Sequence, residues 1–183
     1  NLSNRQRSAA VGAMIILAYA MLTYTITNNL VLGIVTDLIA GFAVILIPIL
    51  MLPLFATDET RGLNIAYMGA RFIEGGLMVA GGIMLAIPSL QPYRNSIYEF
   101  VHIWFFIAGA VYFYILLYRT RIVPPYIAAW GFIAALALLL MMILNMLSIS
   151  SPFLAVLVLP IVLNELYLAV WLMVKGFRSP AVR

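Results

Sequence analysis

The sequence has no cysteine and a single histidine, His102, among its 183 residues. The missing thiols exclude disulfides, thiolate nucleophiles, iron–sulfur clusters and haem attached through cysteine. One histidine cannot hold a haem between two imidazoles or build a multi-histidine zinc site. We therefore predict no metal site and no cofactor. Single axial ligation of a haem or pigment by His102 is the one contact of this kind that the residues allow.

Charged residues are also scarce. They make up 9% of the chain, against roughly 25% in an average soluble domain, while 66% of the residues are hydrophobic. This composition excludes a soluble globular protein. The ten basic residues outnumber the six acidic ones but are scattered along the chain, so no nucleic-acid surface is predicted. The partner that the composition predicts is the lipid bilayer.

Six apolar segments are each long enough to cross a bilayer, which takes about 20 residues. They run from Ala9 to Ile26, Leu30 to Leu54, Leu63 to Ile87, Ile97 to Leu117, Tyr126 to Leu147 and Phe153 to Val174. The first also resembles a secretory signal with a cleavage site at Ala20, but its apolar run continues further, which favours a span. The connectors are too short to fold alone. The sequence predicts an all-α, polytopic transmembrane helical bundle of six spans, forming one domain over residues 1–183.

The basic residues outside the spans predict the orientation. With a cytoplasmic N-terminus, Arg94 alone lies outside, and eight basic residues lie inside: Arg5, Arg7, Arg61, Arg119, Arg121, Lys175, Arg178 and Arg183. Because cytoplasmic loops carry the excess of Lys and Arg, both termini are predicted to be cytoplasmic. Aromatic residues near the span ends, such as Tyr98 at the outer boundary and Trp130 at the inner one, fit the same orientation.

Small residues recur in two of the predicted spans. They are Gly69, Gly76, Ala80 and Gly82 in the third, and Ala128, Ala129, Gly131, Ala134, Ala135 and Ala137 in the fifth. Small side chains let membrane helices approach closely. We expect these residues to serve packing within the bundle, and contact within a homodimer is the alternative.

Several polar residues lie well within the predicted spans. They are the ionisable residues Asp37, Arg71, Glu74, His102 and Glu165, together with Asn145 and Asn164. A charge at mid-membrane costs roughly 2.5–3.5 kcal/mol on an insertion scale, so such residues pair, bind a proton or line water. At about 1.5 Å of rise per residue, the set extends from the midplane into the outer half. It predicts either a polar pocket open to the outside or a structural network that fixes the helix packing.

The charges of this set do not balance. Three carboxylates face one guanidinium and one imidazole, which leaves −2 when all are ionised and His102 is neutral. A low-dielectric interior tolerates such an excess poorly, so we expect either that Glu165 carries a proton or that a cation or cationic ligand is bound. Two prolines also lie within spans, and a kink is predicted at each: Pro48 in the second, and Pro160, just before Asn164 and Glu165, in the sixth.

Short motifs follow one another along the chain in a recognisable order. They are Asp37, Arg71-Phe-Ile-Glu74, His102, Leu116-Leu117-Tyr118-Arg119 leading to Pro124, and Asn164-Glu165 followed by Leu172-Met-Val-Lys175-Gly176. Their order and spacing, over about Val35 to Phe177, resemble an uncharacterised family of bacterial integral membrane proteins catalogued as domain of unknown function 4386. The resemblance implies a helical bundle in the bacterial cytoplasmic (inner) membrane. It supplies no reaction, substrate or catalytic residue.

Three functions remain open at this point. The first is the binding of a small or lipid-like ligand in the outward-opening polar pocket, with Arg71 holding an anionic head group. The second is an accessory subunit of a larger membrane complex, with a pigment or haem on His102. The third is an intramembrane enzyme that uses Glu74 or Glu165 with His102 as acid and base. No catalytic signature supports the third, so we predict no catalytic residue and rank it last.

Overall fold

The computed structural model describes residues 2–149 and 151–178. Six helices in this part of the chain are long and apolar enough to cross a membrane. The elements are α1 (Asn4–Ala18), η1 (Tyr19–Leu22), α2 (Thr23–Thr27), α3 (Leu30–Phe55), α4 (Arg61–Ala86), α5 (Tyr93–Ile97), η2 (Tyr98–His102), α6 (Ile103–Thr120), α7 (Pro125–Met146), η3 (Pro152–Val158) and α8 (Leu159–Val174). The short elements η1 and η3 have 3-10 geometry, and η2 is a π-helical turn. Three spans are therefore composite helices: α1–η1–α2, α5–η2–α6 and η3–α8.

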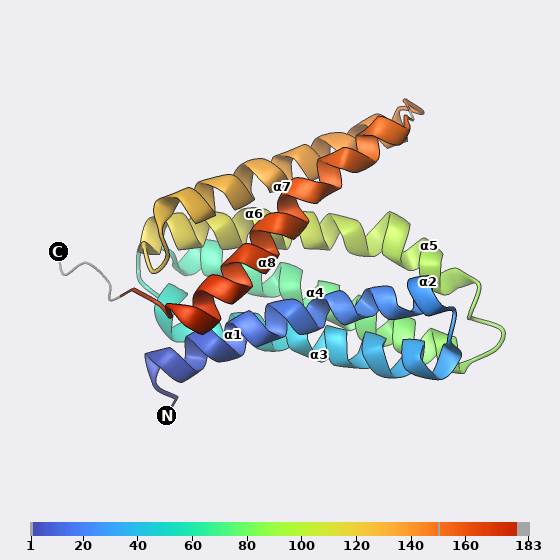
Figure 1. Ribbon diagram of the computed structural model, residues 1–183, viewed down its shortest axis with the longest axis horizontal. Coiled ribbons are helices and arrows are strands. Elements are labelled where there is room, and N and C mark those ends of the chain that lie inside the picture. Colours follow the sequence, from blue (N-terminus) through green and yellow to red (C-terminus); the bar gives the residue numbers. More distant parts are fainter. Residues whose placement is uncertain (1, 150, 179–183) are drawn as a thin grey trace.

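The six spans close into a ring in chain order (Figure 1). α1 packs against α3, α3 against α4, α4 against α6, α6 against α7, α7 against α8, and α8 returns to α1. The predicted all-α bundle of six spans is thus confirmed. In Figure 1 the hairpin of α7 and α8 leans away from α1 and α6 at the end of the ring that is far from the termini.

Both ends of the described chain lie at one end of the ring, which we call the basic end. It contains the connections 56–60 and 121–124 and carries Arg5, Arg7, Arg61, Arg119, Arg121, Lys175 and Arg178. Arg183 lies outside the described residues. The other end, which we call the opposite end, contains the connections 28–29, 87–92 and 147–151. A single bundle end thus collects the basic residues, and the prediction that it faces the cytoplasm stays a prediction.

Local signals in the sequence account for several helix ends. The hydroxyl of Ser3 accepts from the backbone of Gln6 at 3.2 Å, while the Gln6 side chain accepts from the backbone of Ser3 at 3.0 Å, which is a capping box at the start of α1. The side chain of Asn29 caps α3 with a single hydrogen bond, accepted from the backbone of Leu32 at 3.1 Å. Pro125 takes the first position of α7, where a missing N–H costs nothing. These caps fix the short connections that keep neighbouring spans antiparallel.

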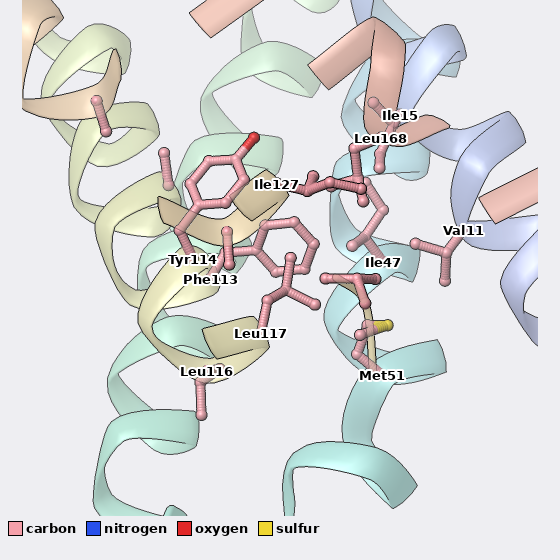
Figure 2. Packing of buried hydrophobic residues seen from close by; sticks show 14 of the residues in the cluster. Val11, Ile15, Ile47, Met51, Phe113, Tyr114, Leu116, Leu117, Ile127 and Leu168 are labelled. Carbon is pink, nitrogen blue, oxygen red and sulfur yellow. The ribbon is translucent and has the colours of Figure 1, made fainter. Parts of the chain in front are cut away.

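The half of the ring toward the basic end is filled by apolar side chains. Figure 2 shows this core, in which residues from the start of α1, the end of α3 and the end of α6 meet. The rings of Phe55, Tyr67 and Phe113 contact one another with centroids 5.5 to 6.1 Å apart. Close packing of this kind fills the interior of the ring in this half.

Glycines allow α3 and α4 to cross closely. A Cβ atom on Gly41 of α3 or on Gly75 of α4 would lie 2.7 Å from the other residue's carbonyl oxygen. In the third predicted span, Gly82 packs against α3 as expected, but Gly69 and Gly76 face away from the bundle, since a Cβ there would meet nothing within 4 Å. The prediction that these two glycines serve packing within the bundle is therefore wrong.

The two predicted kinks have different outcomes. α3 continues through Pro48 to Phe55 and also contains Pro53, so Pro48 is an interior residue, as expected. Pro160 instead lies in the first turn of α8, where no intrahelical hydrogen bond is lost. The prediction of a kink within a continuous α-helix is corrected here: the span begins as the 3-10 segment η3 and changes to α-helix just before Pro160.

Candidate functional site

A cavity of about 610 Å³ lies inside the ring, in the half toward the opposite end and away from the apolar core. Its walls are mostly apolar and come from all six spans, with residues such as Ile15, Val44, Ile47, Phe106, Leu138, Met141, Met142, Ile161 and Val162. Polar residues lie at its two ends. Arg71, Glu74, His102, Glu165 and Tyr19 line its inner part, and the exposed Asn95, Glu99 and Asn145 line it at the opposite end. Its size is that of an ordinary small-molecule site, about 300–1,000 Å³.

Arg71 and Glu74 form an ion pair on the inner wall. Three residues apart on α4, they share a helix face, and Nη1 of Arg71 donates to Oε2 of Glu74 at 2.8 Å. Both are buried, with 5% and 2% exposure. Gly109 of α6 makes room for the guanidinium, because a Cβ there would lie 3.1 Å from Nε of Arg71. That Nε has no hydrogen-bond partner within the described part of the chain, so the arginine is only partly satisfied.

His102 lies beside this pair without bonding to it. Its Nε2 is 3.8 Å from Oε1 of Glu74, too far for a hydrogen bond, and it has no other partner among residues 2–149 and 151–178. The residue ends the π-helical turn η2, and the Tyr98 ring lies 5.0 Å from its own. π-Helical turns within α-helices occur frequently at functional sites. A buried imidazole with a free nitrogen lining a cavity is a candidate ligand contact.

Glu165 approaches the same cluster from α8. Its Oε2 accepts a hydrogen bond from the Tyr19 hydroxyl at 2.6 Å, which joins η1 to α8 across the cavity. Arg71, Glu74 and His102 line the same cavity as Glu165. We call Arg71, Glu74, His102 and Glu165 the inner cluster. With a neutral imidazole, its two carboxylates and one guanidinium leave a formal charge of −1.

Asp37 is absent from the inner cluster and pairs instead with Arg94. Nε and Nη2 of Arg94 donate to Oδ2 and Oδ1 of Asp37 at 2.9 and 2.7 Å. The prediction that Arg94 lies in a connector is wrong, because the residue is helical and only 2% exposed, whereas the prediction that its end of the bundle faces outside stays a prediction. The physical reason is the earlier helix start: α5 begins at Tyr93, not at Ile97, so Arg94 occupies a helical position that faces α3.

The two predicted asparagines lie apart from both ion pairs. Nδ2 of Asn164 donates to the carbonyl oxygen of Ile127 at 3.0 Å, which ties α8 to α7 away from the cavity. Asn145, near the end of α7, is exposed and lines the cavity at the opposite end. Of the seven predicted residues, four therefore form one cluster, Asp37 belongs to a second, and the asparagines join neither.

Tyr19, Tyr98 and Arg94 are the neighbours that the sequence did not reveal as site residues. Arg94 carried a signal nonetheless, since it was the single exception to the basic-residue asymmetry. Arg94, Tyr98 and His102 are also spaced four residues apart, which places them along one face of a helix. For Tyr19 no comparable signal exists, because its partner Glu165 is 146 residues away in the chain.

The arrangement suits recognition of a polar group attached to an apolar body. No group of three or more His, Cys, Asp or Glu that could hold a metal ion occurs within the part of the chain that the structure describes. The inner cluster offers carboxylate oxygens and an imidazole nitrogen, and the walls beside it offer aliphatic and aromatic surface. A ligand with both characters would be held at both.

Comparison with known proteins gives one match. A family model described as a domain of unknown function, DUF4386, matches residues 84–176, just over half of the chain. The matched segment begins at the end of α4 and includes Arg94, His102 and Glu165, whereas Asp37, Arg71 and Glu74 precede it. The matched segment is thus shorter than the segment from Val35 to Phe177 over which the motifs resemble this family. No curated protein and no solved structure matches the chain.

Proposed function

Because the chain belongs to the DUF4386 family, whose description assigns no activity, we propose its function from the cavity: it is a membrane protein that binds a small or lipid-like ligand within the bundle. The observation that carries this proposal is the inner cluster, whose partly satisfied polar groups line a cavity of about 610 Å³ with apolar walls. A structural network alone would be expected to satisfy its buried groups.

The shape of the site supports a ligand that enters from the opposite end of the bundle. The basic half is closed by the core shown in Figure 2, whereas the cavity reaches the exposed residues Asn95, Glu99 and Asn145. With the predicted orientation, that end faces the outside of the bacterial cytoplasmic membrane. An amphiphile could place its apolar body along α7 and α8 and its polar group at the inner cluster.

A neutral photolabel tests this proposal. The protein in lipid nanodiscs is treated with a ten-carbon alcohol bearing a diazirine near the chain end, and the labelled residues are mapped by mass spectrometry. We expect labelling of Met141 and Met142, which line the cavity, and unlabelled decanol should compete with it. Labelling of Met146, which is 71% exposed on the same helix, reports contact with bulk lipid and should resist competition.

Two adjacent substitutions on α8 provide the matched control. Val162→Phe places a ring in the cavity and should lower labelling of Met141 and Met142 at least several-fold. Leu163→Phe adds the same ring on the lipid-facing side, where the residue is 55% exposed, and should leave that labelling unchanged. Labelling of the two methionines that neither decanol nor Val162→Phe reduces would overturn the proposal.

A further inference from the structure

We infer that the ligand of this cavity carries a cationic head group, a protonated amine, which binds among Glu165, Glu74 and His102. The inference rests on the proposed function and specifies the class of ligand that the cavity takes. It replaces the expectation that Arg71 holds an anionic head group. Three observations carry it: the engagement of Arg71, the charge of the inner cluster, and the free acceptor atoms that line the cavity.

Arg71 is already neutralised within the protein. Its Nη1 is bound to Glu74 at 2.8 Å, and its guanidinium lies 5.8 Å from the ring centroids of both Tyr67 and Phe106. Of the other two nitrogens, Nε points toward Gly109 of α6, and Nη2 makes no hydrogen bond to a described residue. An anionic head group would add a third negative charge to a site with one guanidinium. The charge of the arginine is therefore balanced by Glu74, and an anion in the cavity would also face the second carboxylate, Glu165.

The charge count favours a cation. The Asp37–Arg94 pair is neutral and accounts for one of the three intramembrane carboxylates. In the inner cluster, Glu74 and Glu165 face Arg71 alone, which leaves −1 beside apolar walls when both carboxylates are ionised. An unbalanced charge is costly in a medium of low dielectric constant. A ligand with one positive charge removes that excess, whereas a neutral ligand leaves it in place.

The free atoms are acceptors that suit an ammonium group. Oε2 of Glu165 is bound to Tyr19, while its second oxygen makes no hydrogen bond to any described residue. Oε1 of Glu74 makes no hydrogen bond to a described residue and lies 3.8 Å from Nε2 of His102. His102 is 3% exposed and lines the cavity with an unpartnered Nε2, which accepts a hydrogen bond when the neutral ring carries its proton on Nδ1. An ammonium has three donors, so it can meet an acceptor on each of these three residues.

Competition against the neutral photolabel distinguishes the head groups. Decylamine, decanol and decanoate share one chain and are titrated against labelling of Met141 and Met142 in nanodiscs of neutral phosphatidylcholine, with Met146 reporting the amount in the bilayer. Because hydrogen bonds to charged groups are stronger than neutral ones, decylamine should compete at about ten-fold lower concentration than decanol, and decanoate should be the weakest. Equal competition by the three, or strongest competition by decanoate, would overturn the inference.

Two carboxylate-to-amide substitutions test whether Glu165 causes the preference for decylamine. Glu165→Gln removes the excess charge but keeps an acceptor for Tyr19, so decylamine should fall to the level of decanol. Glu99→Gln makes the same change at an exposed residue lining the cavity and should keep the preference. The preference of the wild-type protein decides the inference even if Glu165→Gln fails to fold. If the alcohol label itself shows no saturable labelling, the proposed function fails instead, so the two failures are distinguishable.

Discussion

Two arginines are buried in this bundle, and they differ in how completely their hydrogen bonds are made. Arg94 donates twice to Asp37, to the carbonyl oxygen of Met21 at 2.8 Å and to the side chains of Thr25 and Asn95 at 3.3 and 3.0 Å. Arg71 donates once, to Glu74, and its Nε remains without a partner among the described residues.

The complete set of hydrogen bonds, that of Arg94, is part of a structural connection between helices. Arg94 joins η1 and α2 to α3 and α5 at the opposite end of the bundle, and the Tyr98 ring covers its guanidinium at 4.1 Å. Both arginines line the cavity, and the incomplete set of hydrogen bonds is that of Arg71, on the inner wall. Buried polar groups in proteins are usually satisfied, so the complete hydrogen bonding of Arg94 is typical of architecture. Among the buried atoms without a partner in the described part of the chain, which include the hydroxyls of Tyr67 and Tyr114, Nε of Arg71 and Nε2 of His102 belong to residues that line the cavity. This difference ranks the expected effects of mutation.

The largest expected effect is on stability and follows from removing Arg94. Arg94→Met keeps an apolar stem but leaves the Asp37 carboxylate buried, at 0% exposure, without its counter-ion. Breaking a buried ion pair in this manner costs about 3–5 kcal/mol. We expect a large fall in the unfolding temperature of the protein in detergent, measured by tryptophan fluorescence.

The matched control is Arg119→Met, which removes an exposed arginine of α6 and should leave the unfolding temperature unchanged. The double variant Arg94→Met/Asp37→Leu removes both charges together and should recover much of the loss, because no unpaired carboxylate remains. If Arg94→Met unfolds no earlier than Arg119→Met, the Asp37–Arg94 pair is not the structural connection described above.

A smaller loss is expected from crowding the same connection. In Gly81→Ala, the new Cβ would lie 2.7 Å from the Tyr98 ring and 3.3 Å from Oδ2 of Asp37. Overpacking a well-filled region costs about 1–3 kcal/mol. Gly69→Ala on the same helix meets nothing within 4 Å and should be neutral or slightly stabilising, because alanine favours the helix. Equal unfolding temperatures for the two variants would show that Tyr98 and Asp37 are free to move aside.

The fold was predictable to the level of spans because apolar length is a local property. The residues at which helices begin and end were less predictable. The fourth span was predicted from Ile97, where its apolar run begins, but α5 starts at Tyr93 and brings polar residues into the membrane-spanning helix. A charged residue at the edge of an apolar run is ambiguous, since only its partner decides whether it is exposed. For Arg94 that partner is Asp37, 57 residues away.

The candidate site was predictable as a set of residues but not as an arrangement. Membrane burial makes any ionisable side chain conspicuous, which is why Arg71, Glu74, His102 and Glu165 were found. Which carboxylate pairs with which arginine depends on the order of helices around the ring. The sequence left Asp37 among the charges of one pocket, and so it predicted an excess of −2 for a cluster whose own charge is −1. The π-helical turn that positions His102 had no sequence signal.

The smallest expected effect comes from Glu165→Gln, and the same carboxylate-to-amide change at Asp37 provides the comparison. Glu165→Gln removes the surplus charge of the inner cluster and keeps the hydrogen bond from Tyr19, so the free energy of unfolding should stay within about 1 kcal/mol of the wild type, in the stabilising direction. Asp37→Asn changes the same atoms but leaves Arg94 without a counter-ion, and it should cost about 3 kcal/mol or more. Unfolding temperatures measured without added ligand compare them directly. If Glu165→Gln proves as damaging as Asp37→Asn, the inner cluster is itself a structural connection, and the contrast between the two arginines fails.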